Sequence, residues 1–169
     1  NFKIKGGDSI KLTVPPTVYP PRRDTELLLQ GLNSIKLQAG NLVEIGCGSG
    51  TGLGYIAEDA KSVIGGDIDS NLVNIASLNY KDNVKVSVQE IDAQAIPFKD
   101  RSFDLVILFE AIYYIPDVKK FISEVKRVIR PKGVLMISTV NCEWHGFNKS
   151  PFSVKYYNAK SLVDMFASE

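Results

Sequence analysis

A glycine-rich segment and an acid that follows it are the residues best suited to form a ligand site. In the run Glu44-Ile45-Gly46-Cys47-Gly48-Ser49-Gly50, a glycine stands at every second position. Glycine permits a tight turn and lets a ligand approach the bare backbone, although many glycine-rich loops are only turns. Asp67 ends the next apolar run, 21 residues after Gly46. An acid at about this distance accepts hydrogen bonds from a ribose diol in nucleotide-binding sheets, so the spacing predicts a site for a nucleotide-like ligand.

Two further acids follow apolar runs of the chain. Asp92 lies after the third run, where a carboxylate can accept a hydrogen bond from an exocyclic amine such as adenine N6; the alternative is an acid in a surface turn. Asp69 is interpreted as a solvated acid or as a charge at the start of a helix. Cys47 and Cys142 lack the spacing of metal ligands, so no metal site is predicted, and Cys47 is expected to be a small buried residue.

Side chains that can exchange a proton come after the fourth and fifth apolar runs. Glu110, Tyr113 and Tyr114 follow the fourth run, and His145, the only histidine, follows the fifth. The two tyrosines can line an acceptor pocket or pack half-buried, and the histidine can act as a base or stand on the surface. We therefore assign no catalytic base from the sequence.

Hydrophobic periodicity predicts the elements that position these residues. Short apolar runs predict five strands, at Leu42–Ile45, Ser62–Asp67, Val84–Val88, Asp104–Phe109 and Val134–Val140. Helices are predicted from the glycine-rich segment to Ala60, from Ser70 as N-cap, from Pro116 to a stop at Pro131 and Gly133, and from Ala159 to Phe166. Strands that alternate with helices imply a parallel sheet covered on both faces. We predict an α/β, doubly wound, Rossmann-like fold with a mostly parallel sheet of strand order 3-2-1-4-5, counting strands along the chain.

The N-terminal residues are predicted to lie apart from this domain. Over residues 1–21 a weak alternation stops at Pro15-Pro16 and Pro20-Pro21, which indicates an extended arm with at most a short hairpin. A helix is predicted from about Arg23 to Leu37, and the domain is assigned to residues 22–169.

Composition excludes several classes of protein. The 169 residues are 44% hydrophobic, which is too apolar for a disordered chain, and 20 Lys plus Arg against 19 Asp plus Glu argue against a nucleic-acid partner. No apolar run approaches the ~20 residues that span a bilayer, and two cysteines are too few for a disulfide scaffold, which indicates a reducing, cytoplasmic setting. The basic residues that follow Pro116 are expected to form a solvated face; they are Lys119, Lys120, Lys126, Arg127 and Arg130.

The motifs, in their order along the chain, resemble those of class I S-adenosylmethionine-dependent methyltransferases. Val43–Gly50 is similar to the first motif of that family. Asp92–Phe98, Ser102–Val106 and Glu124–Gly133 resemble the later motifs of its ubiquinone-biosynthesis-like (type 11) branch. The resemblance covers about Leu42 to Ser138. It implies transfer of a methyl group from S-adenosylmethionine by in-line displacement, with S-adenosylhomocysteine as the product and a small molecule as the expected acceptor.

The resemblance assigns the cofactor to residues that follow the strand ends. Glu44 would hold the amino group of the methionine part, Asp67 the ribose hydroxyls and Asp92 the adenine N6 amine. The remaining assigned residues line the same site: Gly46, Gly48 and Gly50 in the loop, Ile68 and Ala93 beside the adenine, and Phe109 and Glu110 beside the transferred methyl.

Two other functions stay open on the sequence alone. A nicotinamide-dependent oxidoreductase shares the sheet and the ribose acid, but Thr51 stands at the third glycine position of its G-x-G-x-x-G loop. A non-catalytic binding module can keep the same fold.

In the family that the chain resembles, a helix and an antiparallel strand pair follow the fifth strand. Because the chain stops at Glu169, we expect that pair to be absent, the domain to be incomplete and the fifth strand to form an exposed sheet edge.

Overall fold

The computed structural model describes residues 2–3, 9–10, 30–32 and 40–167. Near the N-terminus, β1 (Phe2–Lys3) and β2 (Ser9–Ile10) pair antiparallel, where the sequence indicates at most a short hairpin, and residues 30–32 are helical. The rest of the predicted arm over 1–21, and most of the helix predicted over 23–37, lie outside the described residues. The division into an arm and a domain that begins at residue 22 stays a prediction.

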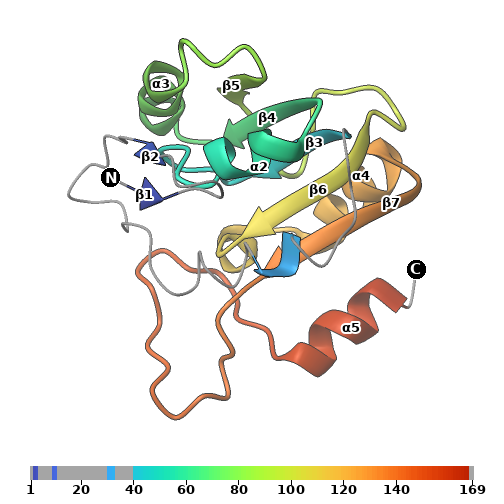
Figure 1. The fold of residues 1–169 in the computed structure, drawn as a ribbon. Coiled ribbons are helices and arrows are strands. Elements are labelled where there is room, and N and C mark those ends of the chain that lie inside the picture. Colours follow the sequence, from blue (N-terminus) through green and yellow to red (C-terminus); the bar gives the residue numbers. More distant parts are fainter. Residues whose placement is uncertain (1, 4–8, 11–29, 33–39, 168–169) are drawn as a thin grey trace.

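Five parallel strands form the central sheet. They are β3 (Asn41–Ile45), β4 (Ser62–Asp67), β5 (Val86–Glu90), β6 (Phe103–Phe109) and β7 (Ile129–Ser138). Their spatial order is β5-β4-β3-β6-β7, and every neighbouring pair is parallel, which confirms the predicted doubly wound sheet of order 3-2-1-4-5 (Figure 1). The chain runs outward from β3 to β5 and then crosses back to β6. The strand order therefore reverses beside β3, and the carboxyl ends at such a reversal are where open α/β sheets bind ligands.

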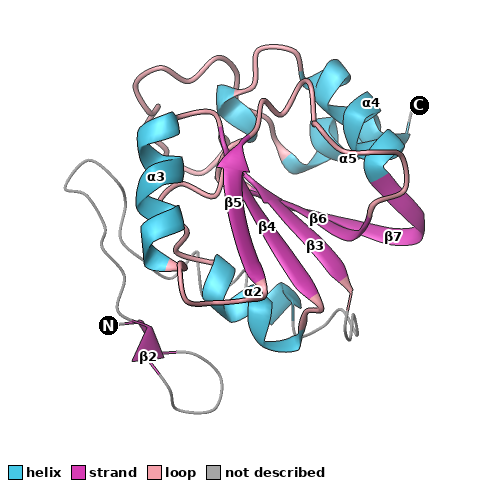
Figure 2. Ribbon diagram, turned by 90° about the horizontal axis from the view of Figure 1, so that it is seen from above, coloured by secondary structure: helices cyan, strands magenta, loops and turns pink. Residues whose placement is uncertain are grey.

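Helices cover both faces of this sheet (Figure 2). α2 (Leu53–Asp59) and α3 (Ser70–Asn79) connect the strands of one half, whereas α4 (Val118–Val128) and α5 (Ala159–Ala167) follow β6 and β7. Successive side chains of the two central strands enter different cores: Leu42, Leu105 and Ile107 pack with α2, and Val43, Val106 and Leu108 pack with α4. This alternation is the pleat of strands that are buried on both faces, as the sequence predicts.

The starts of α3 and α4 differ from the predicted ones because acidic side chains cap them. Asp69, rather than Ser70, is the N-cap of α3, and its carboxylate accepts a hydrogen bond from the Asn71 backbone N–H at 2.8 Å. Asp69 is therefore both an exposed acid and the residue at a helix start, the two roles predicted for it. α4 begins after Asp117 rather than at Pro116. β5 starts at Val86, two residues later than predicted.

β7 begins five residues before the predicted strand, so that Pro131 and Gly133 lie inside it rather than between elements. The pairing register shifts between Phe103, opposite Ile129, and the next partners along the two strands, which marks a β-bulge or a similar irregularity at this point. A bulge leaves extra residues outside the ladder, so a proline without an N–H is tolerated there. The strand also ends at Ser138, two residues earlier than predicted.

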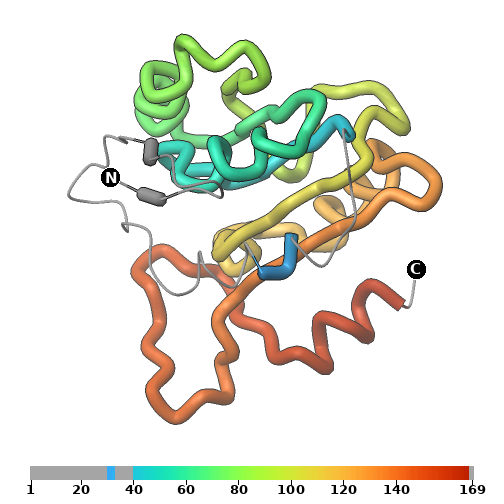
Figure 3. The backbone as a smooth tube through the Cα atoms, viewed as in Figure 1, coloured from blue at the N-terminus to red at the C-terminus, as the bar shows by residue number. Residues whose placement is uncertain are grey.

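β7 is the outermost strand of the described sheet, and residues 139–158 then form a long loop that projects from the sheet before α5 (Figures 1 and 3). A cavity of about 420 Å³ lies along the end of β7, between Gly31 and α5. Over the described ranges, no helix combines the length and the hydrophobicity needed to cross a bilayer.

The prediction that all five basic residues after Pro116 form a solvated face is wrong for two of them. The Arg130 guanidinium binds the Asp104 carboxylate at 2.6 Å, and Arg127 binds Glu124 at 2.7 Å and Asp100 at 3.2 Å. Asp100 and Asp104 lie 27 and 26 residues before their arginine partners, so a charge pattern within one helix does not reveal these pairs.

Candidate functional site

The glycine-rich segment forms a tight loop between β3 and α2, at the carboxyl end of the central strand. Gly46, Gly48 and Gly50 have φ angles of 73°, 55° and 84°, in the left-handed region that favours glycine. The N–H groups of Gly46 and Cys47 both donate to the Gly66 carbonyl, at 2.7 and 2.9 Å, which ties the loop to β4. The alternating glycines are therefore required by the backbone geometry of this turn.

Two residues at the end of α3 brace the same loop, although no motif of the sequence indicates them. The buried Tyr80 hydroxyl donates to the Gly50 carbonyl at 2.6 Å and accepts from the Gly54 N–H at 3.0 Å. Asn79 donates to the Ser49 carbonyl at 3.1 Å. Burial raises the pKa of Tyr80, so its hydroxyl remains a donor. These partners are 26 to 30 residues apart in sequence, which is why no local pattern reveals them.

Asp67, the acid that ends β4, lies against the glycine-rich loop. One carboxylate oxygen accepts from the Gly48 N–H at 2.8 Å and the other from the Asp69 N–H at 3.0 Å. Each oxygen keeps a free lone pair for a further donor, because a carboxylate can accept about four hydrogen bonds. The carboxylate is thus held in one orientation at the end of β4.

Glu44 is buried in β3, directly beneath the start of α2. Its side chain is 4% exposed, and a Cβ placed on Gly52 would lie 3.2 to 3.3 Å from its carboxyl oxygens. Its Oε2 atom has no hydrogen-bond partner among the described residues. Burial, together with the nearby Asp67 carboxylate, raises the pKa of Glu44 to about 8. An acid in this state is stabilised by any ligand that brings a hydrogen-bond donor or a positive charge.

Asp92 and its neighbours form the turn that follows β5. Asp92 Oδ1 accepts from the Gln94 N–H at 2.8 Å and from the Gln94 side-chain amide at 3.2 Å. Asp92 is therefore in a turn, as its alternative interpretation had it, but it is half-buried there and at the same sheet edge as Asp67. Ala93 packs against the core, whereas Ile68 is 67% exposed at the start of the neighbouring connection.

Glu110 follows β6 with a φ angle of 50°, which is uncommon for a residue with a side chain. Such strain persists where surrounding contacts hold it and is frequent at functional sites. The Glu110 N–H donates to the Ser138 carbonyl at 2.8 Å, and the hydroxyls of Ser138 and Tyr113 each lie 3.4 Å from its carboxylate oxygens. Phe109, the last residue of β6, is half-buried beside it.

Besides Glu110, the three other candidates for proton exchange, Tyr113, Tyr114 and His145, have different surroundings. Tyr113 is buried, its ring stacks on Tyr156 at 4.8 Å, and burial followed by the Glu110 charge raises its pKa. Tyr114 is exposed, with its hydroxyl 2.6 Å from that of Ser150. His145 is exposed in the loop after β7, with its ring 5.6 Å from that of Trp144. Of the three, Tyr113 is the one in contact with a predicted site residue.

Cysteine and acidic residues do not assemble into a metal site within the described part of the chain, where no group of three or more potential ligands occurs. Cys47 is buried and free, as expected, and burial together with Glu44 and Asp67 raises its pKa well above the usual value.

Comparison with known proteins identifies the family. A family profile described as a methyltransferase domain matches residues 43–137, more than half of the chain. The chain belongs to this methyltransferase family. It is 33% identical over 129 residues to a probable S-adenosylmethionine-dependent methyltransferase of Mycolicibacterium smegmatis, in a match that covers 74% of this chain and 49% of that protein. The chain spans about half the length of the curated relatives it matches.

Solved structures share the fold of this methyltransferase domain. The YcgJ protein from Bacillus subtilis is similar with a TM-score of 0.76 and 21% identity, over 86% of this chain and 67% of that chain. The [4+2]-cyclase SpnF is similar with a TM-score of 0.74 and 22% identity, over 86% of this chain and 55% of that chain. Because a cyclase shares the fold, the fold alone does not establish methyl transfer, and the site must be argued from its residues.

The methyltransferase domain gathers the predicted cofactor residues at one edge of its sheet. Glu44, Asp67, Asp92 and Glu110 all lie at or just beyond the carboxyl ends of neighbouring parallel strands. Their roles toward a ligand remain predictions.

Proposed function

We propose that this methyltransferase domain binds S-adenosylmethionine at the carboxyl ends of β3 to β6 and transfers its methyl group to a small-molecule acceptor. The observation that carries the proposal is the buried Glu44 carboxyl, which has an oxygen without a partner in the described part of the chain. Buried polar groups are normally hydrogen-bonded. The ammonium group of the methionine part would supply both a donor and a positive charge at this carboxyl.

The glycine loop fits a cofactor that lies close to the backbone. A Cβ on Gly48 would meet no heavy atom of the described structure within 4 Å, so this position borders open space. The adjacent Asp67 carboxylate, fixed by two backbone N–H groups, is proposed to take the ribose hydroxyls. Asp92 uses Oδ1 for Gln94, which leaves Oδ2 for the adenine N6 amine, and the exposed Ile68 would pack on the adenine ring with the Ala93 backbone nearby.

When bound, S-adenosylmethionine supplies an activated methyl group on a positively charged sulfur, so the chemistry is the cofactor's own. The residues of this chain are proposed to orient it: Glu44 at the amino group, Asp67 at the ribose, and Phe109 and Glu110 beside the transferred methyl. Alignment of two reactants can lower a barrier by up to roughly 7–11 kcal/mol. This chain's contribution is therefore positioning and exclusion of water rather than an assigned catalytic base.

The acceptor side is proposed to lie beyond β6 and β7. Tyr113 forms an aromatic cluster with Tyr114, Tyr156 and Phe147, with ring centroids 4.6 to 4.8 Å apart, and its hydroxyl faces the Glu110 carboxylate. An aromatic wall beside a carboxylate suits a small acceptor that has an apolar body and a polar reacting group. The formal net charge of +1 offers no support for a nucleic-acid acceptor, and the free Cys47 and Cys142 suit the cytoplasmic setting that we propose.

Calorimetry with S-adenosylmethionine, S-adenosylhomocysteine and NAD in separate titrations tests the cofactor assignment. We expect the first two to bind and NAD not to bind. Asp67→Ala should weaken binding at least about tenfold, the effect of losing charge-assisted hydrogen bonds, whereas the control Asp82→Ala, at an exposed position in the turn after α3, should not. Binding of NAD alone would support the oxidoreductase instead and would refute the proposal.

Methyl transfer requires a separate assay, because a binding module would pass the titrations. Cofactor with a labelled methyl group is incubated with pools of small phenols, amines and lipid-like acceptors, and in parallel with RNA and with protein. Label in a small-molecule product is the expected result. Tight cofactor binding without transfer to any pool would favour the non-catalytic module, and label in RNA or protein would contradict the small-molecule assignment.

A further inference from the structure

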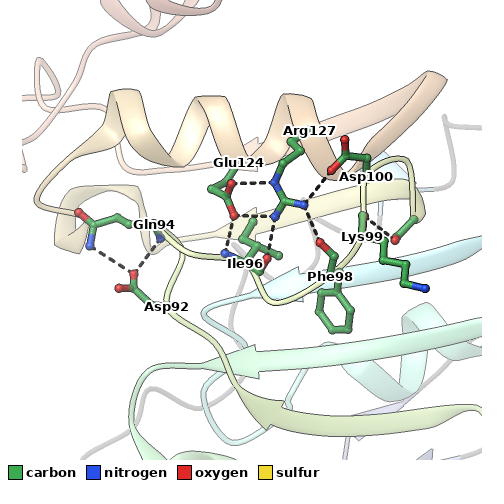
Figure 4. Close-up of polar contacts among 9 residues, drawn as sticks. Asp92, Gln94, Ile96, Phe98, Lys99, Asp100, Glu124 and Arg127 are labelled. Atoms are coloured by element: carbon green, nitrogen blue, oxygen red, sulfur yellow. Dashed lines mark hydrogen bonds and ion pairs between the residues drawn. The ribbon is translucent and has the colours of Figure 1, made fainter.

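Arg127 in α4 binds the backbone of the turn that follows β5. Its guanidinium donates to the Ile96 carbonyl at 2.8 Å and to the Phe98 carbonyl at 2.6 Å (Figure 4). It also forms a two-pronged pair with Glu124, at 2.7 and 2.8 Å, and reaches Asp100 at 3.2 Å. A guanidinium has five N–H donors in a fixed fork, and Arg127 makes five hydrogen bonds here.

Glu124 completes this attachment from the same helix. Its Oε2 atom accepts from the Ile96 N–H at 2.7 Å, while Arg127 binds the Ile96 carbonyl. The Glu124–Arg127 ion pair therefore holds both backbone polar groups of Ile96, its N–H and its carbonyl. The Arg127 side chain is only 32% exposed, although its position on α4 indicates a solvated face. Charge-assisted bonds in a planar fork resist displacement more than a single lysine contact does.

Gln94 links this attachment to Asp92. The Gln94 side chain donates to Asp92 Oδ1 at 3.2 Å and accepts from the Asp117 N–H at the start of α4 at 3.0 Å. The turn is therefore hydrogen-bonded to α4 at two places, at Asp117 and at Arg127 with Glu124. Figure 4 shows the second attachment together with Gln94 and Asp92. The contacts with Gln94 fix Oδ1 of Asp92. The backbone of the turn then sets the direction in which Oδ2 points.

We propose that Arg127 is a positioning residue that holds Asp92 for the adenine amine and so sets the base selectivity of the cofactor site. This inference rests on the proposed function. Without the Arg127 side chain, the turn keeps the Gln94–Asp117 and Ile96–Glu124 hydrogen bonds to α4. A hydrogen bond weakens steeply when its geometry is lost, so a turn held less firmly would present Asp92 to the adenine amine less precisely. The residues proposed to hold the rest of the cofactor, Glu44 and Asp67, lie on β3 and β4, and Arg127 forms its hydrogen bonds with other residues.

The test compares two ligands that differ at the base. S-adenosylhomocysteine carries the N6 amine, whereas S-inosylhomocysteine has at that position a carbonyl, which accepts a hydrogen bond and cannot donate one to Asp92. Wild type should bind the adenine ligand at least about tenfold more tightly, the worth of one charge-assisted hydrogen bond. Arg127→Met should lose most of that preference, chiefly by weakening the adenine ligand, while Lys119→Met, a matched exposed cation of α4, should keep it. Arg127→Lys should lose part of the preference for the adenine ligand. It replaces Arg127→Met in the test if the Met variant does not fold.

An Asp92→Ala background separates positioning from general loss of structure. In that background the adenine preference should be absent, and adding Arg127→Met should not change the ratio of the two affinities. If Arg127→Met and Arg127→Lys weaken both ligands equally, or weaken neither, Arg127 does not position Asp92 and the inference is wrong. If wild type binds neither ligand, the proposed function itself fails and the inference falls with it.

Discussion

Glu44→Gln should remove most of the loss of stability that the ligand-free protein shows as the pH rises from about 4.5 to 8. The pKa of Glu44 is raised from an ordinary value of 4.5 to about 8, by burial and by the Asp67 carboxylate. The native state therefore keeps a proton that the unfolded state loses in this window. Stability from this carboxyl is fully present below pH 4.5 and is lost as the pH rises toward 8.

The magnitude follows from the size of the window. Each pH unit between the two pKa values lowers the free energy of unfolding by about 1.4 kcal/mol, so the loss reaches about 5 kcal/mol at most by pH 8. Glutamine has nearly the same shape but does not titrate. Burying its amide without a partner has a cost of about 1–3 kcal/mol, but that cost does not vary with pH and cancels when slopes are compared.

Urea unfolding at pH 5, 6, 7 and 8 measures the two slopes. The free energy of unfolding of the wild type should fall steadily over this range, and that of Glu44→Gln should fall much less. If the two proteins are equally stable at pH 5, the variant should be the more stable one at pH 8. Parallel pH profiles for the two proteins would refute the reasoning, because they would show that Glu44 does not carry the raised pKa.

Three further outcomes follow from the same site. At pH 7, binding of S-adenosylmethionine should release close to one proton as Glu44 ionises, and calorimetry in buffers of different ionisation enthalpy should show no such release for Glu44→Gln. Tyr80→Phe removes the partner of both the Gly50 carbonyl and the Gly54 N–H, so it should lower the free energy of unfolding by about 1–3 kcal/mol and weaken cofactor binding; an unchanged melting temperature would contradict this. Gly50→Ala should destabilise the fold more than Gly48→Ala, because its Cβ would lie 2.8 Å from the Tyr80 ring whereas that of Gly48 meets nothing within 4 Å of the described structure, and equal melting temperatures would be evidence against it.

The parallel sheet and the edge that carries the site were predictable because their signals are local, and the strand order followed from the doubly wound class of fold. Apolar runs that alternate with helical periodicity indicate a parallel sheet, and in such a sheet the carboxyl ends of the strands share one edge. Asp67 and Asp92 were found in this way. The ends of helices and strands were less predictable where a cap or a register shift decides them, as at Asp69 and at Pro131. Several nearby residues can cap a helix or end a strand, and tertiary contacts decide which of them does so.

The sequence by itself determined the class of fold, the glycine loop and the chemical types of the side chains at the strand ends, since these depend on residue identity and spacing. The tertiary structure decided how those side chains behave. The raised pKa of Glu44 depends on its burial and on the nearness of Asp67, and the support from Tyr80 and Arg127 depends on partners some 26 to 31 residues away. Solvent exclusion and long-range hydrogen bonds exist only once the chain has packed, so no pattern of neighbouring residues encodes them.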